Sequence, residues 1–470
     1  MPDQFTRRNL FGSMANGVCG AALASLLTRD LHAEVFDVKP RKPHFDAKAK
    51  AVIHLFMNGG PSQMDLFDPK PVLDKHHGEA YFDKVAADLT GPEQAGGLMK
   101  SPFQFAQHGK SGMWVSELMP HLAKRVDDIC LIRSMYTAHP NHEPALFQIH
   151  SGRIIPGRPS LGSWVAYGLG SENQSLPAYV VLDDPLGLPV NGTQNWQAGF
   201  LPPVYQGTRI RTNGSPILNL RPEHEESSAM ADAARTLLSR LDEIHKRNHP
   251  GQLQLDARIA SYELAARLQI EASDALDISK ESDATRQAYG VGEEPTDSYG
   301  KRCLMARRLV ERGVRFIQLY INGQIWDNHN QLESGMRSAS ERTDKPVAAL
   351  LKDLKERGLI DSTLVIWGGE FGRMPIAQLD GGLKNAGRDH NPRAFSLWMA
   401  GGGVKPGITY GSSDELGYEA VENKVSVADW HATILHLLGM DYQRLVFNDN
   451  GLKEKLTSQF EASVVKAILT

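Results

Sequence analysis

Six short apolar runs, separated by longer segments with helical patterns, constrain the fold of this 470-residue chain more than any other feature. The runs are AVIHLFM (51–57), ICLIRSM (129–135), AYVVLD (178–183), VRFIQLYI (314–321), TLVIWGG (363–369) and FSLWMAG (395–401). Nearly continuous apolar runs of this length are typical of strands that are buried on both faces. Helical patterns lie at about 116–126, 142–150, 345–357 and 429–439. The alternation predicts an α/β fold with a mostly parallel central sheet and helices on both faces.

The bulk composition excludes several classes of protein. Apolar residues make up 41% of the chain and charged residues 23%, values that are typical of a globular protein. The net charge of −4 gives no basic field, so we expect no nucleic-acid partner. Three cysteines cannot form a disulfide framework, and Cys130 and Cys303 lie on apolar segments where buried thiols are expected.

The N-terminus has the pattern of an export signal. TRRNLF (6–11) precedes a weakly apolar stretch, which is typical of twin-arginine signals, and cleavage after Ala33 is predicted. The alternative is an ordinary amphipathic helix. No later stretch has the length and apolar content of a membrane span, so we expect an exported periplasmic or extracellular protein without an integral membrane segment.

The remainder of the chain is predicted to be a polar linker (34–49) and one domain (50–470) with two insertions. Residues 184–222 are rich in Pro, Gly and Asn and indicate a surface insertion. Residues 225–275 are charged and helix-periodic, which predicts two long helices that could form a cap over the core.

Carboxylate, imidazole and guanidinium side chains recur directly after four of the apolar runs. They are Asn58 and Asp65 after the first run, Thr137, His139 and His142 after the second, Asp327 and His329 after the fourth, and Glu370, Arg373, Arg388, Asp389 and His390 after the fifth. In sheets of this class, functional groups gather at the carboxyl ends of the strands. We therefore expect these residues to converge.

Oxygen and nitrogen side chains of this kind suit Zn, Mn or similar divalent ions. The candidate metal ligands are Asn58, Asp327, His329, Glu370, Asp389 and His390. Two such ions can hold the attacking and leaving oxygens of an in-line displacement. Arg373 and Arg388 would supply the guanidinium fork for a tetrahedral oxyanion. The alternative is a solvated, salt-bridged loop after residue 369 and a simple turn at 327–329.

The segment 141–150 carries a second signal. Asn141 is a plausible N-cap, and the helix that it starts would offer free backbone N–H groups to a phosphate or sulfate. His142 or Thr137 would then lie where a nucleophile is needed. The alternative is that Asn141 only caps the helix.

Taken in order, these motifs resemble the alkaline-phosphatase superfamily and, within it, a bacterial family of unknown function numbered 1501. The resemblance is carried by the twin-arginine leader and by NGGPSQMDLFDPKP (58–71), HPNHEPALFQIHSGR (139–153), WDNHNQ (326–331), GGEFGRMP (368–375), GRDHNP (387–392), MAGGGVKPG (399–407) and ADWHATILHLLGMD (428–441). It implies an alkaline-phosphatase-like sheet and metal-dependent hydrolysis of phosphate or sulfate esters.

Carried over by position, the resemblance implies one metal site formed by Asp327, His329 and His390. Glu370 would match a ligand of a second metal, and Asn58 falls where the superfamily usually has an aspartate, with Asp65 as a replacement. The nucleophile position falls near His142. The chain has no Cys-x-Pro-x-Arg motif, so the formylglycine of true sulfatases has no residue on which to form.

These observations predict an exported hydrolase of phosphate or sulfate esters that uses a divalent metal, Zn, Mn or Ca, on a small-molecule or polysaccharide substrate. His142, Arg373 and Arg388 are the predicted catalytic residues. The alternative is a noncatalytic relative that binds an anionic glycan or a partner protein, and the missing Ser, Thr or Cys nucleophile favours it. A metal-dependent mutase of sugar phosphates is a third hypothesis, which export disfavours.

Overall fold

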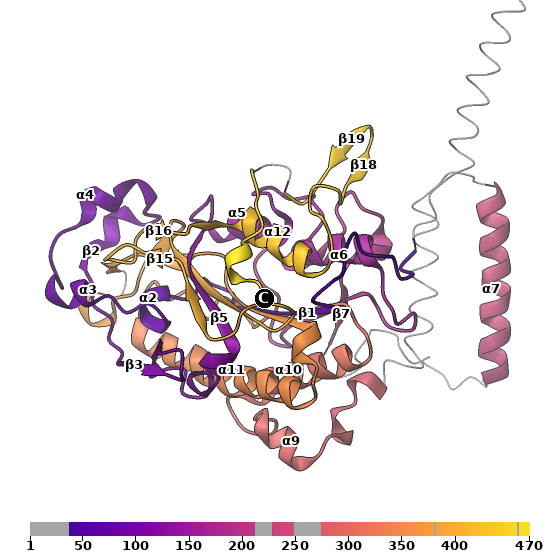
Figure 1. Cartoon of the computed structure of the whole chain (residues 1–470), viewed down its shortest axis with the longest axis horizontal. Coiled ribbons are helices and arrows are strands. Elements are labelled where there is room, and N and C mark those ends of the chain that lie inside the picture. Colours follow the sequence, from indigo (N-terminus) through magenta and orange to yellow (C-terminus); the bar gives the residue numbers. More distant parts are fainter. Residues whose placement is uncertain (1–36, 212–227, 249–273, 380–381, 458–459) are drawn as a thin grey trace, which may run out of the picture.

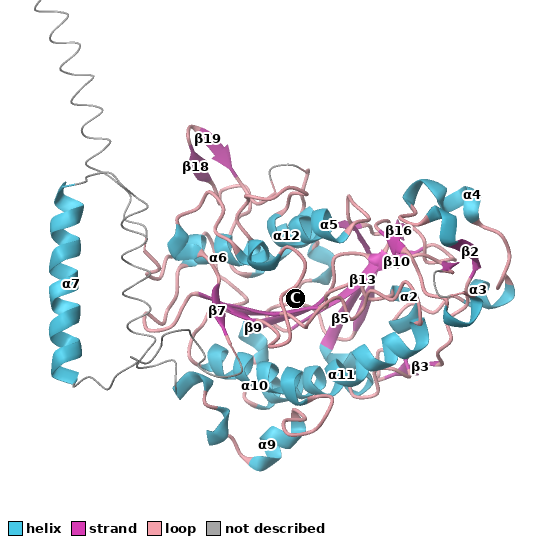
Figure 2. Cartoon of the chain, turned by 180° about the vertical axis from the view of Figure 1, so that it is seen from behind, coloured by secondary structure: helices cyan, strands magenta, loops and turns pink. Residues whose placement is uncertain are grey.

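A sheet of nine strands lies between two layers of helices at the centre of the described chain (Figures 1 and 2). The computed structural model describes residues 37–211, 228–248, 274–379, 382–457 and 460–470. The sheet order is β14-β5-β13-β9-β1-β8-β6-β7, and β17 also pairs with β5. The strands are β1 (Ala51–Phe56), β5 (Ile129–Tyr136), β6 (Tyr179–Leu182), β7 (Thr208–Ile210), β8 (Phe316–Leu319), β9 (Thr363–Gly368), β13 (Phe395–Ala400), β14 (Ile408–Tyr410) and β17 (Val425–Ser426).

Each of the six apolar runs forms a strand of this sheet, and the predicted α/β class is confirmed. The neighbouring strands pair in parallel except β13, which is antiparallel to both β5 and β9. The reversal matters for function, because it places the start of β13 at the edge where β5 and β9 end. The loop 369–394 leaves and re-enters the sheet at this one edge.

Helices cover the two faces separately. α5 (His142–Ser151), α6 (Leu161–Leu169) and α12 (Val427–Leu437) lie on one face, and α10 (Asp297–Glu311) and α11 (Leu332–Glu356) on the other (Figures 1 and 2). Successive strand residues point to opposite faces, so β1 contributes Val52 and Phe56 to one apolar core and Ile53 and Leu55 to the other. Cys130 and Cys303 are buried free thiols, as predicted.

Short elements surround these layers. They are α2 (Gln63–Leu66), α3 (Pro71–Lys75), α4 (Phe82–Val85), α9 (Asp283–Ala288), β2 (Ala95–Leu98), β3 (Phe105–His108), β4 (Met113–Ser116), β10 (Gly372–Arg373), β11 (Ile376–Gln378), β12 (His390–Asn391), β15 (Ser412–Ser413), β16 (Ala420–Glu422), β18 (Phe447–Asp449) and β19 (Leu452–Glu454). Within the ranges that the structure describes, no helix combines the length and apolar composition that a membrane span requires.

The predicted α-helix at 116–126 is wrong. Ser116 ends strand β4, and the chain then forms a 3₁₀ helix, η3 (Leu122–Asp128). Pro120 prevents a continuous helix, and the buried carboxylate of Asp344 accepts the backbone N–H groups of His121 and Leu122 at 2.7 and 2.8 Å. A tertiary contact therefore replaces the intrahelical hydrogen bonds.

The segment expected as a polar linker lies against the domain from residue 37 onward. The N–H of Arg41 donates to Leu169, and those of Lys48 and Ala49 donate to the carbonyl of Leu437. The predicted leader, 1–33, lies outside the described residues.

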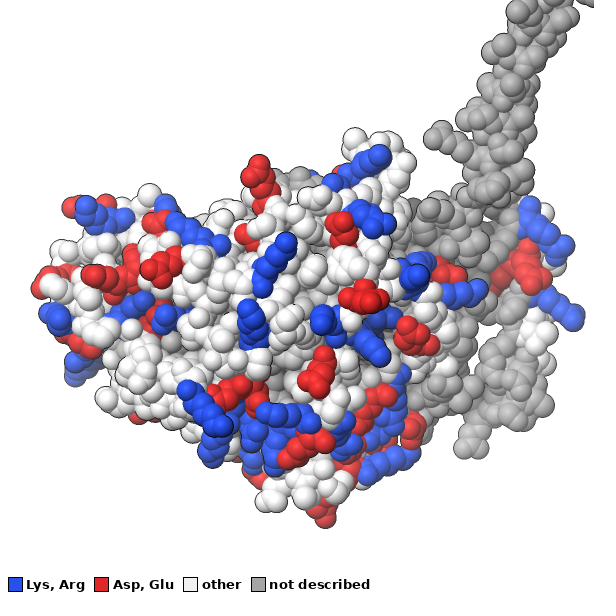
Figure 3. Space-filling model, in the orientation of Figure 1, with Lys and Arg blue, Asp and Glu red and all other residues white. Residues whose placement is uncertain are grey.

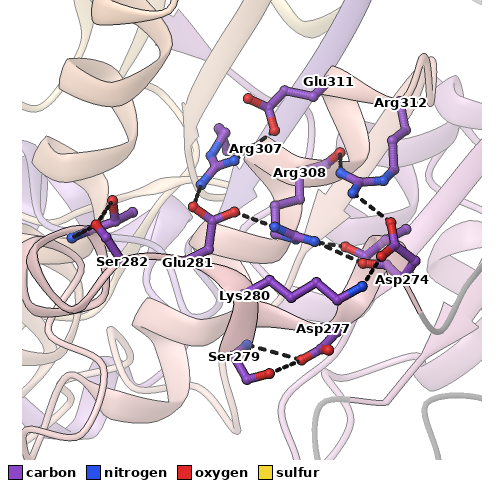
Figure 4. A network of polar contacts seen from close by, with 12 residues as sticks. Asp274, Asp277, Ser279, Lys280, Glu281, Ser282, Arg307, Arg308, Glu311 and Arg312 are labelled. Carbon is purple, nitrogen blue, oxygen red and sulfur yellow. Dashed lines mark hydrogen bonds and ion pairs between the residues drawn. The ribbon is translucent and has the colours of Figure 1, made fainter.

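The first of the two helices predicted within 225–275 is α7 (Ser228–Asn248), which stands apart from the layered body in both views (Figures 1 and 2). The second falls outside the described residues. The chain returns at Asp274, where Arg308 of α10 donates to the carbonyls of Asp274 and Ala275 at 2.8 and 3.0 Å. Arg312 pairs with the Asp274 carboxylate, and Figure 4 shows this network. The network joins the start of the returning segment to α10.

Three histidines are buried between the sheet and the helices above it. His54 of β1 lies 6.0 Å from the ring of His150 on α5, and Nε2 of His431 on α12 lies 2.8 Å from the carbonyl of Ile149. Burial, followed by the charge of His431, lowers the pKa of His54 to about 3, and burial lowers the pKa of His431 to about 4. Burial also puts the pKa of His150 well below its usual value. All three imidazoles are neutral in the folded protein.

These histidines predict a loss of stability in acid. The unfolded chain binds their protons below about pH 6.5 and the folded chain does not, so stability is complete above that pH and falls toward pH 4. His54→Phe is expected to flatten this fall by about 1.4 kcal/mol per pH unit. Urea unfolding at a series of pH values measures the slope, with the exposed His76→Phe as the control. An unchanged slope in His54→Phe would contradict the prediction.

Candidate metal centre

Four side chains converge at the carboxyl edge of the sheet. They are His142, Asp327, His329 and His390, and one ligand atom from each lies within 4.8 Å of the others. His142 is the first residue of α5, which follows β5, and Asp327 and His329 follow β8. His390 lies in β12, on the loop that follows β9. Residues scattered over almost 250 positions of sequence thus meet because their strands end at one edge.

Asp327 is the centre of the cluster. Its Oδ1 lies 2.9 Å from Nε2 of His329 and 3.1 Å from Nε2 of His390. Its Oδ2 lies 3.2 Å from Nε2 of His142. Three imidazole nitrogens therefore face one carboxylate, and solvent reaches the group because the Asp327 and His329 side chains are 18% and 27% exposed.

Neighbouring groups orient these side chains. Nδ1 of His329 lies 2.6 Å from Oε1 of Gln378, which turns the opposite ring nitrogen toward Asp327. The short antiparallel pair β10–β12 places Arg373 opposite His390. Arg373 in turn donates to Oδ1 of Asp327 at 2.6 Å. Such supporting contacts fix the ring orientation that a metal ligand needs.

Glu370 lies next to His142, and Asn58 directly precedes Gly59, which donates to Glu370. The Glu370 side chain is fully buried, and its Oε1 lies 2.6 Å from Nδ1 of His142 and accepts the N–H of Gly59 at 3.1 Å. Its Oε2 is buried and has no hydrogen-bond partner among the described residues, and the same holds for Oδ1 of Asn58. Buried acceptor oxygens without donors are costly unless a cation or water satisfies them. Each of these two oxygens is therefore free to accept a contact from a cation or a water.

Gly59 makes this close packing of the strand end possible. Its φ of +107° is one that side chains rarely allow, and a Cβ there would lie 2.6 Å from the backbone nitrogen of Asp327. The Asn-Gly-Gly sequence at the end of β1 is the sequence feature that indicates this close approach of the two backbone segments.

The guanidinium groups of the two predicted oxyanion arginines are both occupied by other protein groups. Arg373 is buried, and beyond Asp327 it donates to the carbonyls of Gly59, Gly60 and Arg388. Arg388 is also buried and pairs with Asp65 through Nε at 2.7 Å and Nη2 at 3.3 Å. Arg373 therefore positions Asp327, and Arg388 ties the loop to α2.

Asp389 and Thr137 also have other partners. Oδ2 of Asp389 accepts the N–H groups of Thr90 and Gly91 at 2.7 and 3.0 Å, and Asp389 lies outside the four-residue cluster. Oγ1 of Thr137 donates to Gln148 on α5 at 2.8 Å. We therefore propose neither residue as a ligand or a nucleophile.

The charge state of the cluster follows from these contacts. Burial alone would raise the pKa of Asp327, but Arg373 and the three imidazoles hold that pKa well below its usual range. Burial opposes protonation of His142, yet its hydrogen bonds to Asp327 and Glu370 outweigh it and raise the pKa. Burial lowers the pKa of His390 to about 3 in spite of Asp327. An ionised Asp327 and a neutral His390 are the protonation states that metal ligands require.

The sequence of the whole domain matches one family model, described as "Protein of unknown function (DUF1501)", over residues 49–469. The chain belongs to this family. No curated protein matches the sequence.

Solved structures resemble this DUF1501 member only distantly. The lipoteichoic acid synthase LtaP from Listeria monocytogenes has a TM-score of 0.34 and 10% identity, with 89% of this chain and 78% of that chain covered. The phosphonate monoester hydrolase SpPMH from Silicibacter pomeroyi has a TM-score of 0.35 and 11% identity, with 89% of this chain and 76% of that chain covered. Alkaline phosphatase from the Antarctic bacterium TAB5 has a TM-score of 0.31 and 11% identity, with 77% of this chain and 95% of that chain covered. Similarities this low say nothing about the activity of this chain.

For this DUF1501 member, sequence reasoning missed the supporting residues rather than the cluster itself. Gln378 carries no local motif, and its contact with His329 spans 49 positions of sequence. Asp65 was expected as a replacement ligand for Asn58, but its carboxylate instead pairs with Arg388, 323 positions away. The β10–β12 pair that aligns Arg373 with His390 is too short for a periodicity signal.

Proposed function

We propose that this protein is an exported, metal-dependent hydrolase of phosphate or sulfate esters. The observation that carries the proposal is the convergence of His142, Asp327, His329 and His390 within 4.8 Å, beside the unpartnered oxygens of Glu370 and Asn58. The export part rests on the twin-arginine pattern at residues 6–11.

The two imidazoles and one carboxylate of His329, His390 and Asp327 favour Zn or Mn over Ca, because Ca takes oxygen ligands almost exclusively. Asp327, His329 and His390 would hold one ion, and Glu370 and Asn58 would hold oxygens toward a second. When bound, such ions supply Lewis acidity to the ester oxygens.

The chain's own residues would do the rest of the chemistry. Arg373 keeps Asp327 ionised and oriented. Nδ1 of His142 is tied to Glu370, so its Nε2 is the atom that would hold or pass a proton at the reacting group. The start of α5 directs backbone N–H groups toward the same edge, where an anionic ester would be stabilised.

The test is a metal analysis followed by an activity panel. Purified protein is expected to bind Zn or Mn and to hydrolyse an aryl phosphate or an aryl sulfate once that metal is supplied. Elemental analysis after dialysis measures the first, and release of the aryl chromophore measures the second. Protein that binds neither metal would contradict the proposal.

One observation favours the noncatalytic candidate. Thr137, the hydroxyl nearest in sequence to the expected nucleophile position, already donates its hydroxyl hydrogen to Gln148. Metal binding without turnover of either ester, together with binding of a sulfated polysaccharide, would support this second function.

A further inference from the structure

A cavity of about 400 Å³ lies beside the candidate metal centre. Thr137 and Ala138 line it from the segment that leads to His142, and Pro392 lines it from the segment that follows His390. The N–H of Thr137 donates to the carbonyl of Pro392 at 2.9 Å, so the two segments meet here. The rings of His142 and His390 lie 4.3 Å apart between centroids, so the same two segments that line the cavity also carry two members of the cluster. The cavity is thus a neighbour of the cluster.

The charges that line this cavity cancel. Arg393 donates through Nε and Nη2 to the carboxylate of Asp88. Nζ of Lys424 lies 2.8 Å from Oε1 of Glu419. The lining contains two cations and two carboxylates, so its formal charge is zero. A further anionic group would find no net attraction, whereas hydroxyl groups can accept from the cations and donate to the carboxylates.

An aromatic ring completes the lining. Tyr136, the last residue of β5, lines the cavity and is 39% exposed, so a bound molecule can reach its ring. The Arg393 and Lys424 side chains are 46% and 47% exposed, so their remaining N–H groups are accessible. A ring face flanked by accessible donors and acceptors suits a sugar ring, which has an apolar C–H face and hydroxyl edges.

We propose that this cavity binds a neutral, polyhydroxylated alcohol moiety, a sugar ring or a similar polyol, while the ester group of the same molecule lies at the metal centre. The part of the proposal that concerns turnover rests on the proposed hydrolase function. The binding of a sugar by the cavity does not.

The first experiment compares two esters on the metal-loaded protein. A hexose phosphate or sulfate probes the cavity and the metal centre together, and the methyl ester of the same acid probes the metal centre alone. Wild type is expected to prefer the hexose ester in kcat/KM, and Tyr136→Ala and Arg393→Met to lower this preference at least tenfold, mainly through KM. Lys453→Met, on the distant β19, is the control and should keep the preference. An unchanged preference in both cavity variants would overturn the proposal.

A second experiment separates this proposal from the hydrolase proposal. Saturation-transfer NMR with a free neutral hexose measures binding without turnover. Signal in wild type that is lost in Tyr136→Ala and Arg393→Met supports the cavity even if no ester is hydrolysed. Absence of hexose binding to wild type would overturn the proposal. Displacement of the hexose by inorganic phosphate in wild type, but not in Arg393→Met, would also overturn it, because the cavity would then be an anion site.

Discussion

Protein carrying His390→Ala is expected to bind Zn or Mn at least about 100-fold more weakly than wild type. Loss of a residue that only supports a ligand costs 10- to 100-fold in metal affinity, so loss of a direct ligand should cost at least the upper value. The variant leaves Asp327 with two imidazoles in place of three. Metal content after dialysis against a graded chelator measures the change.

Two further variants serve as comparisons for the loss of metal affinity in His390→Ala. Gln378→Ala removes the partner of His329 Nδ1 and should weaken metal binding by about 10- to 100-fold. His139→Ala removes an imidazole three positions from His142 but outside the cluster, and should leave metal binding unchanged. Added metal should also raise the melting temperature of wild type, since an ion at 100 times its Kd stabilises by about 2.7 kcal/mol. A His390→Ala protein that keeps its metal would remove His390 from the site.

The second large effect is expected at Arg388, and it is an effect on folding. Arg388→Met should lower the free energy of unfolding by about 3–5 kcal/mol, because it leaves the buried carboxylate of Asp65 unpaired. Both side chains are fully buried, so water cannot compensate. Arg388 also donates to the carbonyls of Met374 and Met99, which would lose their donor. Urea unfolding monitored by circular dichroism measures the loss.

The matched controls separate folding from catalysis. Arg388→Met combined with Asp65→Leu removes both charges and should recover most of the lost stability. Arg337→Met breaks an exposed pair with Glu117 and should cost less than about 1 kcal/mol. If Arg388→Met kept full stability and lost only activity, Arg388 would be an oxyanion ligand, as its position in the sequence first indicated.

The face of the molecule in Figure 3 carries charged side chains of both signs. Figure 3 shows basic and acidic side chains intermixed on the face it presents, consistent with a net charge of −4.

The sequence was sufficient to predict the central strands, because strands that are buried on both faces are nearly continuous runs of apolar residues. Each of the six apolar runs lies within the sheet, and the polar residues that follow them mark the edge where the site forms. The family was also recognisable from the sequence, since its motifs occur in order between residues 58 and 441, and the family model matches residues 49–469.

The roles of individual charged residues depended on the tertiary structure. Glu370, Arg373, Arg388 and Asp389 occupy one loop and look alike in sequence, yet they meet His142, Asp327, Asp65 and Thr90 respectively. Local sequence determines whether a segment becomes a strand, because backbone pattern and burial are properties of neighbouring residues. The partner of a buried charge lies up to 323 positions away, and only the folded chain decides which distant group neutralises it.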